Sequence, residues 1–204
     1  MTLWNTLPNA ATVQKTIDAL RQNGITAFFV EDEEAARKKV LELIPEKSEV
    51  MEMTSVTLDA VGMAKALRDA QKYTLVRDTL TSMDRKTQGR EMQKLGAAPE
   101  VALGSVHAIT HDGKVIIASN SGSQLPAYSY GADKVIWVVG AQKIVQDLGT
   151  AHTRLYEYTL PLESERAKKA YGVPGSFVSK LLIVHREIQE NRLFMVIINK
   201  VLGF

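Results

Sequence analysis

The residues best suited to chemistry form a short polar loop at residues 119–124, with the sequence Ser-Asn-Ser-Gly-Ser-Gln. The loop follows an apolar run at residues 114–118 and precedes a short segment of helical character at residues 125–130. Its hydroxyls and backbone N–H groups can bind an anion, and the start of a helix adds partial positive charge. The loop matches neither G-x-G-x-x-G nor the Walker pattern. It predicts a site for phosphate, carboxylate or a nucleotide-like group, although a capped turn that binds only water has the same composition.

A second polar segment, residues 54–57 (Thr-Ser-Val-Thr), ends an earlier apolar run. Its alternative role is to cap the following helix through a Ser or Thr side chain. Ligands of open α/β sheets bind outside the carboxyl ends of the strands, so both loops would line one cleft if their strands lie at one edge. The sequence leaves that adjacency open. The candidate ligand-binding residues of the two loops are Ser55, Thr57, Ser119, Asn120, Ser121, Gly122, Ser123 and Gln124.

The histidines and the nearby cations give weaker indications. His107 and His111 would lie roughly 13 Å apart on extended chain, too far to share one metal ion. The sequence has no H-x-x-x-H pair on an expected helix and no acidic ligand cluster, so we predict no metal site. His107 can act as an acid or base, or as a hydrogen-bonded histidine of a sheet. Lys143 and Arg154, expected on the helix after a central strand, can either face an anionic ligand or form a solvated helix face.

Catalytic residues are not assigned. The sequence has no G-x-S-x-G elbow, and Ser119, Ser121 and Ser123 have no evident His or Asp partner, so we do not expect serine hydrolase chemistry. An isomerase or a coenzyme A transferase would need a carboxylate in the cleft. Glu100 and Asp112 are the nearest carboxylates in the sequence.

Composition excludes several classes of protein. The 25 basic and 23 acidic side chains give a net charge of +2, which is too balanced to predict binding to nucleic acid or to an anionic membrane. The absence of cysteine excludes disulfides, thiolate metal sites and an iron–sulfur cluster bound by this chain. We predict no cofactor. The N-terminal residues lack the pattern of a signal peptide and no apolar run is long enough to span a membrane, which predicts a cytoplasmic protein.

The elements that would position these residues alternate between strand and helix. A helix between Asn9 and Gly24, a strand at 25–30, a helix opened by residues 31–34, a strand at 48–53 and a helix at 58–69 predict right-handed βαβ units and a parallel sheet.

The second half of the chain adds a hairpin and a central strand. Residues 111–113 (His-Asp-Gly) form a turn signal between two apolar runs, which predicts a hairpin and therefore a mixed sheet. Residues 134–140 are almost continuously apolar and predict a central strand. The apolar positions from Ile144 to Leu155 predict one face of a following helix. A last helix at 162–171 and two strands complete a single domain over residues 1–204.

Several blocks of the sequence, in order, resemble the LUD domain, the lactate-utilisation family long carried as a domain of unknown function. They are residues 107–113 (HAITHDG), 131–140 (GADKVIWVVG) and 142–148 (QKIVQDL), then Ala151 and Arg154, with residues 54–58 (TSVTL) upstream and the terminal residues 202–204 (LGF). The resemblance covers nearly the whole chain and is strongest from Ala108 to Arg154. The chain looks like a short, stand-alone member without iron–sulfur cysteines.

The resemblance implies a three-layer α/β/α, Rossmann-like fold of the NagB/RpiA/CoA-transferase-like class, whose relatives bind sugar phosphates or coenzyme A thioesters. It also implies a link to oxidation of L-lactate to pyruvate together with iron–sulfur partner proteins. Many members carry a Thr-Gly-Asn-Arg type loop preceded by Asp. This chain keeps the glycine at Gly122, has Gln124 at the arginine position and lacks the acid, so the roles of that arginine and acid do not carry over.

Three hypotheses follow. The first is a cytoplasmic LUD-type protein that binds a small anionic metabolite, whether a carboxylate, a sugar phosphate or a coenzyme A ester, in lactate or related organic-acid metabolism. The second is an enzyme related to sugar-phosphate isomerases or coenzyme A transferases. The third is a non-catalytic accessory subunit with an iron–sulfur protein as its partner. A homodimer is left open.

Overall fold

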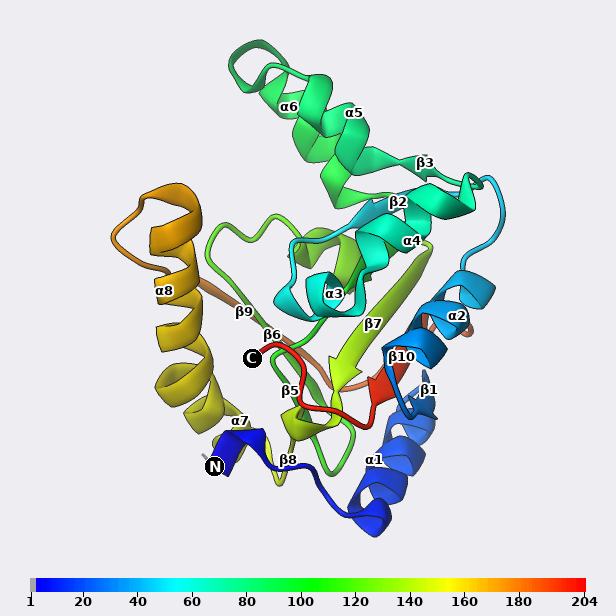
Figure 1. Cartoon of the computed structure of the whole chain (residues 1–204), viewed down its shortest axis with the longest axis vertical. Coiled ribbons are helices and arrows are strands. Elements are labelled where there is room, and N and C mark those ends of the chain that lie inside the picture. Colours follow the sequence, from blue (N-terminus) through cyan, green and yellow to red (C-terminus); the bar gives the residue numbers. More distant parts are fainter. Residues whose placement is uncertain (1–2) are drawn as a thin grey trace.

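A computed structural model describes residues 3–204, and this part of the chain forms two β-sheets with helices around them (Figure 1). The main sheet is parallel throughout. Its strands, in spatial order, are β1 (Ile25–Val30), β10 (Leu193–Ile198), β7 (Lys134–Gly140), β4 (Val101–Gly104), β2 (Glu49–Glu52) and β3 (Thr74–Leu75). This confirms the predicted α/β class with a parallel-dominated sheet flanked by helices, and the central position of residues 134–140.

The second sheet contains the predicted hairpin. Its strands, in spatial order, are β8 (Ile144–Val145), β5 (Ala108–Thr110), β6 (Val115–Ser119) and β9 (Lys180–Val184). β5 and β6 pair antiparallel around a turn in which Gly113 has a φ of 79°. The hairpin was expected to make the main sheet mixed. It lies instead in this separate sheet, because β6 pairs with β9 and β5 pairs with β8.

The first two helices begin at side-chain caps near the starts that the sequence predicted. The Asn9 side chain accepts a hydrogen bond from the Thr12 N–H at 2.8 Å, and Asp32 accepts one from the Ala35 N–H at 2.8 Å. The helices of the first half of the chain are α1 (Ala10–Gln22), α2 (Glu33–Leu43), α3 (Val56–Val61), α4 (Met63–Ala70), α5 (Val76–Ser82) and α6 (Arg85–Ala97). The helix expected at 58–69 is divided into α3 and α4, because Gly62 adopts a left-handed conformation with a φ of 76°.

The segment after β7 differs from its prediction. Ile144 and Val145 were expected on a helix, but they form strand β8 beside β5. The helix α7 (Leu148–Arg154) begins only where the Asp147 side chain accepts from the Thr150 N–H at 2.8 Å. Two β-branched residues fit a strand at least as well as a helix, and the cap fixes the later start.

The remaining segments are short turns and one further helix. The 3₁₀ turns are η1 (Leu3–Asn5) and η3 (Ala141–Lys143), the π-helical turns are η2 (Ala127–Gly131) and η4 (Leu155–Thr159), and the last helix is α8 (Leu160–Tyr171). None of the helices in residues 3–204 combines the length and the apolar character needed to cross a membrane.

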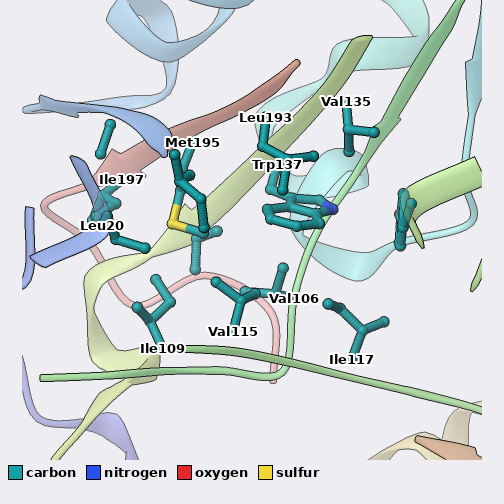
Figure 2. Packing of buried hydrophobic residues seen from close by; sticks show 14 of the residues in the cluster. Leu20, Val106, Ile109, Val115, Ile117, Val135, Trp137, Leu193, Met195 and Ile197 are labelled. Carbon is teal, nitrogen blue, oxygen red and sulfur yellow. The ribbon is translucent and has the colours of Figure 1, made fainter. Parts of the chain in front are cut away.

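The side chains of β7 point alternately to the two faces of the main sheet, and each face packs into its own hydrophobic core. Trp137 and its neighbours on one face pack against the second sheet and α1. Figure 2 shows this packing, with Ile109, Val115 and Ile117 facing Trp137 and Met195. Ile136, on the other face, packs with residues of α2, α3 and α4. The main sheet is therefore buried on both faces, as its continuous apolar strands require.

Candidate functional site

A cavity of about 480 Å³ opens beyond the carboxyl ends of β2, β4 and β7, beside the end of β6. This is the edge at which ligands of open α/β sheets bind. Many polar side chains of its wall come from the segment after β2, the segment after β4, the loop after β6, the end of η3 and helix α8. They include Thr54, Ser55, Thr57, Asp59, Ser105, His107, Ser119, Asn120, Ser121, Ser123, Gln124, Lys143, Glu163 and Arg166.

The two loops selected from the sequence meet at this cavity. Of the eight candidate residues, seven lie in the wall: Ser55, Thr57, Ser119, Asn120, Ser121, Ser123 and Gln124. Gly122 is not among the wall residues. It has a φ of 87°, and a Cβ there would meet the Lys180 side chain, so it serves the turn.

Hydrogen bonds within the loop hold it in shape. Ser119 Oγ donates to Gln124 Oε1 at 2.9 Å and accepts from the Gly122 N–H at 2.8 Å. Gln124 Nε2 donates to the Ala118 carbonyl at 3.3 Å. Gln124 therefore braces the loop against the end of β6.

Ser55 and Thr57 have structural partners as well as places in the wall. Ser55 Oγ accepts from the Leu58 N–H at 3.4 Å and so caps α3, which was the alternative role of this segment. Thr57, which is 1% exposed, contacts Lys143. Ser55 therefore both caps α3 and lines the cavity.

Lys143 is the buried cation of the site. Its Nζ lies 3.1 Å from Thr57 Oγ1, 3.3 Å from Ser105 Oγ and 3.0 Å from the carbonyl oxygen of Val106. The residue is 2% exposed, and within residues 3–204 it forms no ion pair. Burial, and then the positive charge of Arg154, hold the pKa of Lys143 well below its ordinary value. The interpretation of Lys143 as part of a solvated helix face was therefore wrong.

Arg154 is also buried, contrary to the same interpretation. Its Nη1 donates to the His107 carbonyl at 2.6 Å and to Thr159 Oγ1 at 3.0 Å, and its guanidinium lies 5.3 Å from the centre of the Tyr158 ring. In the described part of the chain, its Nε and Nη2 have no hydrogen-bond partner. Burial lowers the pKa of Arg154 to about 10. The guanidinium thus fixes the backbone beside the cavity and adds positive potential to it.

His107 is held as a neutral imidazole. Its Nδ1 accepts from the Ala118 N–H at 3.1 Å. Burial, and then the charges of Lys143 and Arg154, lower the pKa of His107 to about 3. The side chain links the segment after β4 to the end of β6, which favours the hydrogen-bonded role over a role as acid or base.

The carboxylates named from the sequence lie elsewhere. Glu100 accepts from the Glu49 N–H at 2.8 Å, and Asp112 binds Thr110 and Lys114 in the hairpin turn. Neither is in the wall. The wall carboxylates are Asp59 and Glu163, and Glu163 is paired with Arg166 at 2.7 Å.

Ser105 was missed from the sequence. It directly follows β4, so the rule that located the other two loops also applies to it. The weak alternation of residues 101–110, interpreted as one extended stretch, hid the end of β4. No group of three or more His, Asp or Glu side chains in the described residues is arranged to hold a metal ion.

Comparisons with known proteins show the family of this chain and one solved structure of similar fold. A family model described as LUD domain matches residues 13–190. The crystal structure of a DUF162 family protein from Deinococcus radiodurans is 15% identical, with a TM-score of 0.54 over 95% of this chain and 100% of that chain. Ribose 5-phosphate isomerase A from Methanocaldococcus jannaschii is 11% identical, with a TM-score of 0.40 over 84% of this chain and 96% of that chain. Among curated proteins, no match is found.

Proposed function

Because the chain belongs to the LUD domain family, we propose that its cavity binds a small anionic metabolite and serves lactate or related organic-acid utilisation. Its volume of about 480 Å³ lies within the range of about 300–1,000 Å³ typical of small-molecule sites. Hydroxyl and amide groups from the loops after β2 and β6 would orient the ligand.

The buried Lys143 is the observation that carries this proposal. Its contacts with Thr57, Ser105 and the Val106 carbonyl supply polarity but no negative charge. A buried cation without a counter-ion is costly, and a bound carboxylate or phosphate would remove that cost. Since the lowered pKa of Lys143 favours the neutral amine in the empty site, anion binding would take up a proton and strengthen as the pH falls.

Thermal unfolding with ligand panels tests the proposal. L-lactate, pyruvate, ribose 5-phosphate and acetyl-coenzyme A are added separately at saturating concentration, and the rise in Tm is measured. A ligand at about 100 times its Kd stabilises the folded protein by about 2.7 kcal/mol, which is a clear shift for a domain of this size. At least one of these ligands should produce it.

Paired lysine variants connect the shift to the site. Lys143→Met should abolish the ligand-dependent rise in Tm. Lys134→Met should keep it, because Lys134 begins the same strand and its Nζ donates to the Leu43 carbonyl at the opposite edge. If none of the ligands stabilises the wild-type protein, or if Lys143→Met responds as the wild type does, the proposal is wrong.

A further inference from the structure

We propose that Ser105 and Lys143 form a nucleophile–base pair that hydrolyses a small ester or thioester in the cavity. This inference rests on the proposed function, because the carboxylate product of that reaction is the kind of anion the cavity would bind. Neither residue belongs to the polar loops selected from the sequence.

The geometry of the pair fits this role. Ser105 Oγ lies 3.3 Å from Lys143 Nζ, and Ser105 is half-buried in the cavity wall, where a substrate can reach it. Nucleophile–base hydrogen bonds are often long in empty sites and shorten when substrate binds. The Val106 carbonyl, 3.0 Å from the same Nζ, orients the base, as the third member of a catalytic triad does.

As a base, Lys143 must be a neutral amine, with two N–H donors and one lone pair. In the structure its Nζ donates to the Val106 carbonyl, Thr57 Oγ1 and Ser105 Oγ, while Ser105 Oγ donates to Thr57 Oγ1 at 3.3 Å. Because Ser105 Oγ lies 3.3 Å from both Thr57 Oγ1 and Lys143 Nζ, rotation of the hydroxyl alone turns its proton from Thr57 to the amine. The buried position and the charge of Arg154 favour this neutral form, and in residues 3–204 no carboxylate pairs with the amine to oppose them.

The backbone on both sides of Ser105 is fixed. Gly104 ends β4 against the Tyr128 hydroxyl, where a Cβ would overlap that oxygen, and Tyr128 is 2% exposed. On the other side, the Arg154 guanidinium holds the His107 carbonyl at 2.6 Å. Ser105 therefore presents its hydroxyl from a rigid segment, which a nucleophile requires.

The reaction balances with water as the second substrate. Ser105 Oγ forms a bond to the acyl carbon while its proton passes to Lys143 Nζ. The bond from the acyl carbon to the alkoxide or thiolate then breaks, and the leaving group takes that proton. Water attacks the acyl-serine with Lys143 again as base, which releases the carboxylate and restores the serine.

A biotinylated fluorophosphonate tests the pair in the intact protein. Its phosphorus bonds to an activated serine oxygen as fluoride leaves, and peptide mass spectrometry identifies the modified residue. We expect labelling at Ser105 in the wild type and none at that site in Ser105→Ala. Lys143→Met should slow labelling about 100-fold or more, the usual loss when a general base is removed.

Matched controls separate the pair from its surroundings. Ser129→Ala removes an exposed serine that bonds the Pro126 carbonyl, and Lys134→Met removes the lysine at the start of β7; both should label at the wild-type rate. In the wild type the labelling rate should rise with pH to a plateau, as Lys143 loses its proton. The pH dependence of the wild-type labelling rate also tests the proposal if Lys143→Met does not fold. A rate that does not change with pH would show that Lys143 is not the base of Ser105.

Other results would also overturn it. They are a folded wild type that does not react, a label on another serine, or a Lys143→Met variant that labels at the wild-type rate. If the wild type does not react but is stabilised by a carboxylate in thermal unfolding, only the nucleophile is wrong and the anion site stands.

Discussion

Burial of the His107 imidazole beside two cations makes the stability of the protein dependent on pH. Its pKa is about 3 in the folded state, because burial and the charges of Lys143 and Arg154 oppose a second proton, and near 6.5 in the unfolded chain. Between these values the unfolded state binds more protons. The free energy of unfolding should therefore fall as the pH is lowered from about 6.5 towards 3, by at most about 1.4 kcal/mol per pH unit from this group.

The comparison of wild type with His107→Gln measures this contribution. Glutamine can still accept from the Ala118 N–H but does not titrate. Urea unfolding from about pH 7 to about pH 5 should give a steeper loss for the wild type, so the stability difference shrinks on acidification. Burial raises the pKa of Glu52, so this group makes the free energy of unfolding rise as the pH falls. Both proteins contain Glu52, so its contribution cancels when their free energies of unfolding are subtracted. Parallel curves for the two proteins would contradict the assignment.

At the scale of elements, the sequence predicts those strands whose position follows from a local run of apolar residues. The strands at 25–30 and 134–140 were predicted at their observed bounds, because continuous apolar runs are typical of buried parallel strands. The loop after β2 was selected because it follows a strand of the parallel sheet. The loop after β6 was selected by the same rule, but β6 lies in the second sheet and pairs antiparallel with β5 and β9, so the rule does not explain its place at the cavity.

The residues missed from the sequence depend on contacts that no local pattern records. Lys143 looked like a solvated residue because the burial of a lysine is decided by β5, α3 and the segment after β4, all distant in the sequence. Ile144 and Val145 fit a helix face and a strand equally well, and only pairing with β5 selects the strand. The hairpin was predicted, but its sheet was not, because its partner β9 lies more than sixty residues later.

The terminal segment after β10 contributes Phe204 to the cavity wall and packs Gly203 against Thr57. Gly203 has a φ of 64°, and a Cβ would overlap Thr57 Oγ1, the hydroxyl that binds Lys143. Gly203→Ala should therefore cost the strain of a left-handed alanine, about 1–2 kcal/mol, and also displace Thr57. We expect a loss of stability in urea and a weaker ligand-dependent rise in Tm.

Gly172→Ala is the matched control for this change. Gly172 ends α8 with a φ of 66°, but a Cβ there meets no atom of the described residues within 4 Å. It should lose only the backbone strain of about 1–2 kcal/mol and keep the ligand response. Equal effects of the two substitutions would show that Gly203 has no special contact with the site.

At the scale of the whole molecule, the connection between β9 and β10 joins the two sheets. β9 belongs to the second sheet and β10 to the main sheet. Between them Arg192 is 3% exposed, and it donates to the carbonyls of Ala127, Tyr128 and Ala132 at 3.0–3.1 Å and to Glu187 at 2.7 Å. One guanidinium thus connects this crossing to η2, which carries Tyr128 behind the cavity.

Removal of that guanidinium should destabilise the protein more than removal of a surface arginine. Arg192→Met leaves the largely buried Glu187 carboxylate without its partner and three carbonyls without a donor, so we expect a loss of about 3–5 kcal/mol. Arg68→Met removes an exposed pair with Asp78 and should cost less than about 1 kcal/mol. Urea unfolding with a shared m value measures both. If Arg192→Met loses no more than Arg68→Met, the crossing is held by apolar packing alone, and the buried ion pair does not join the sheets.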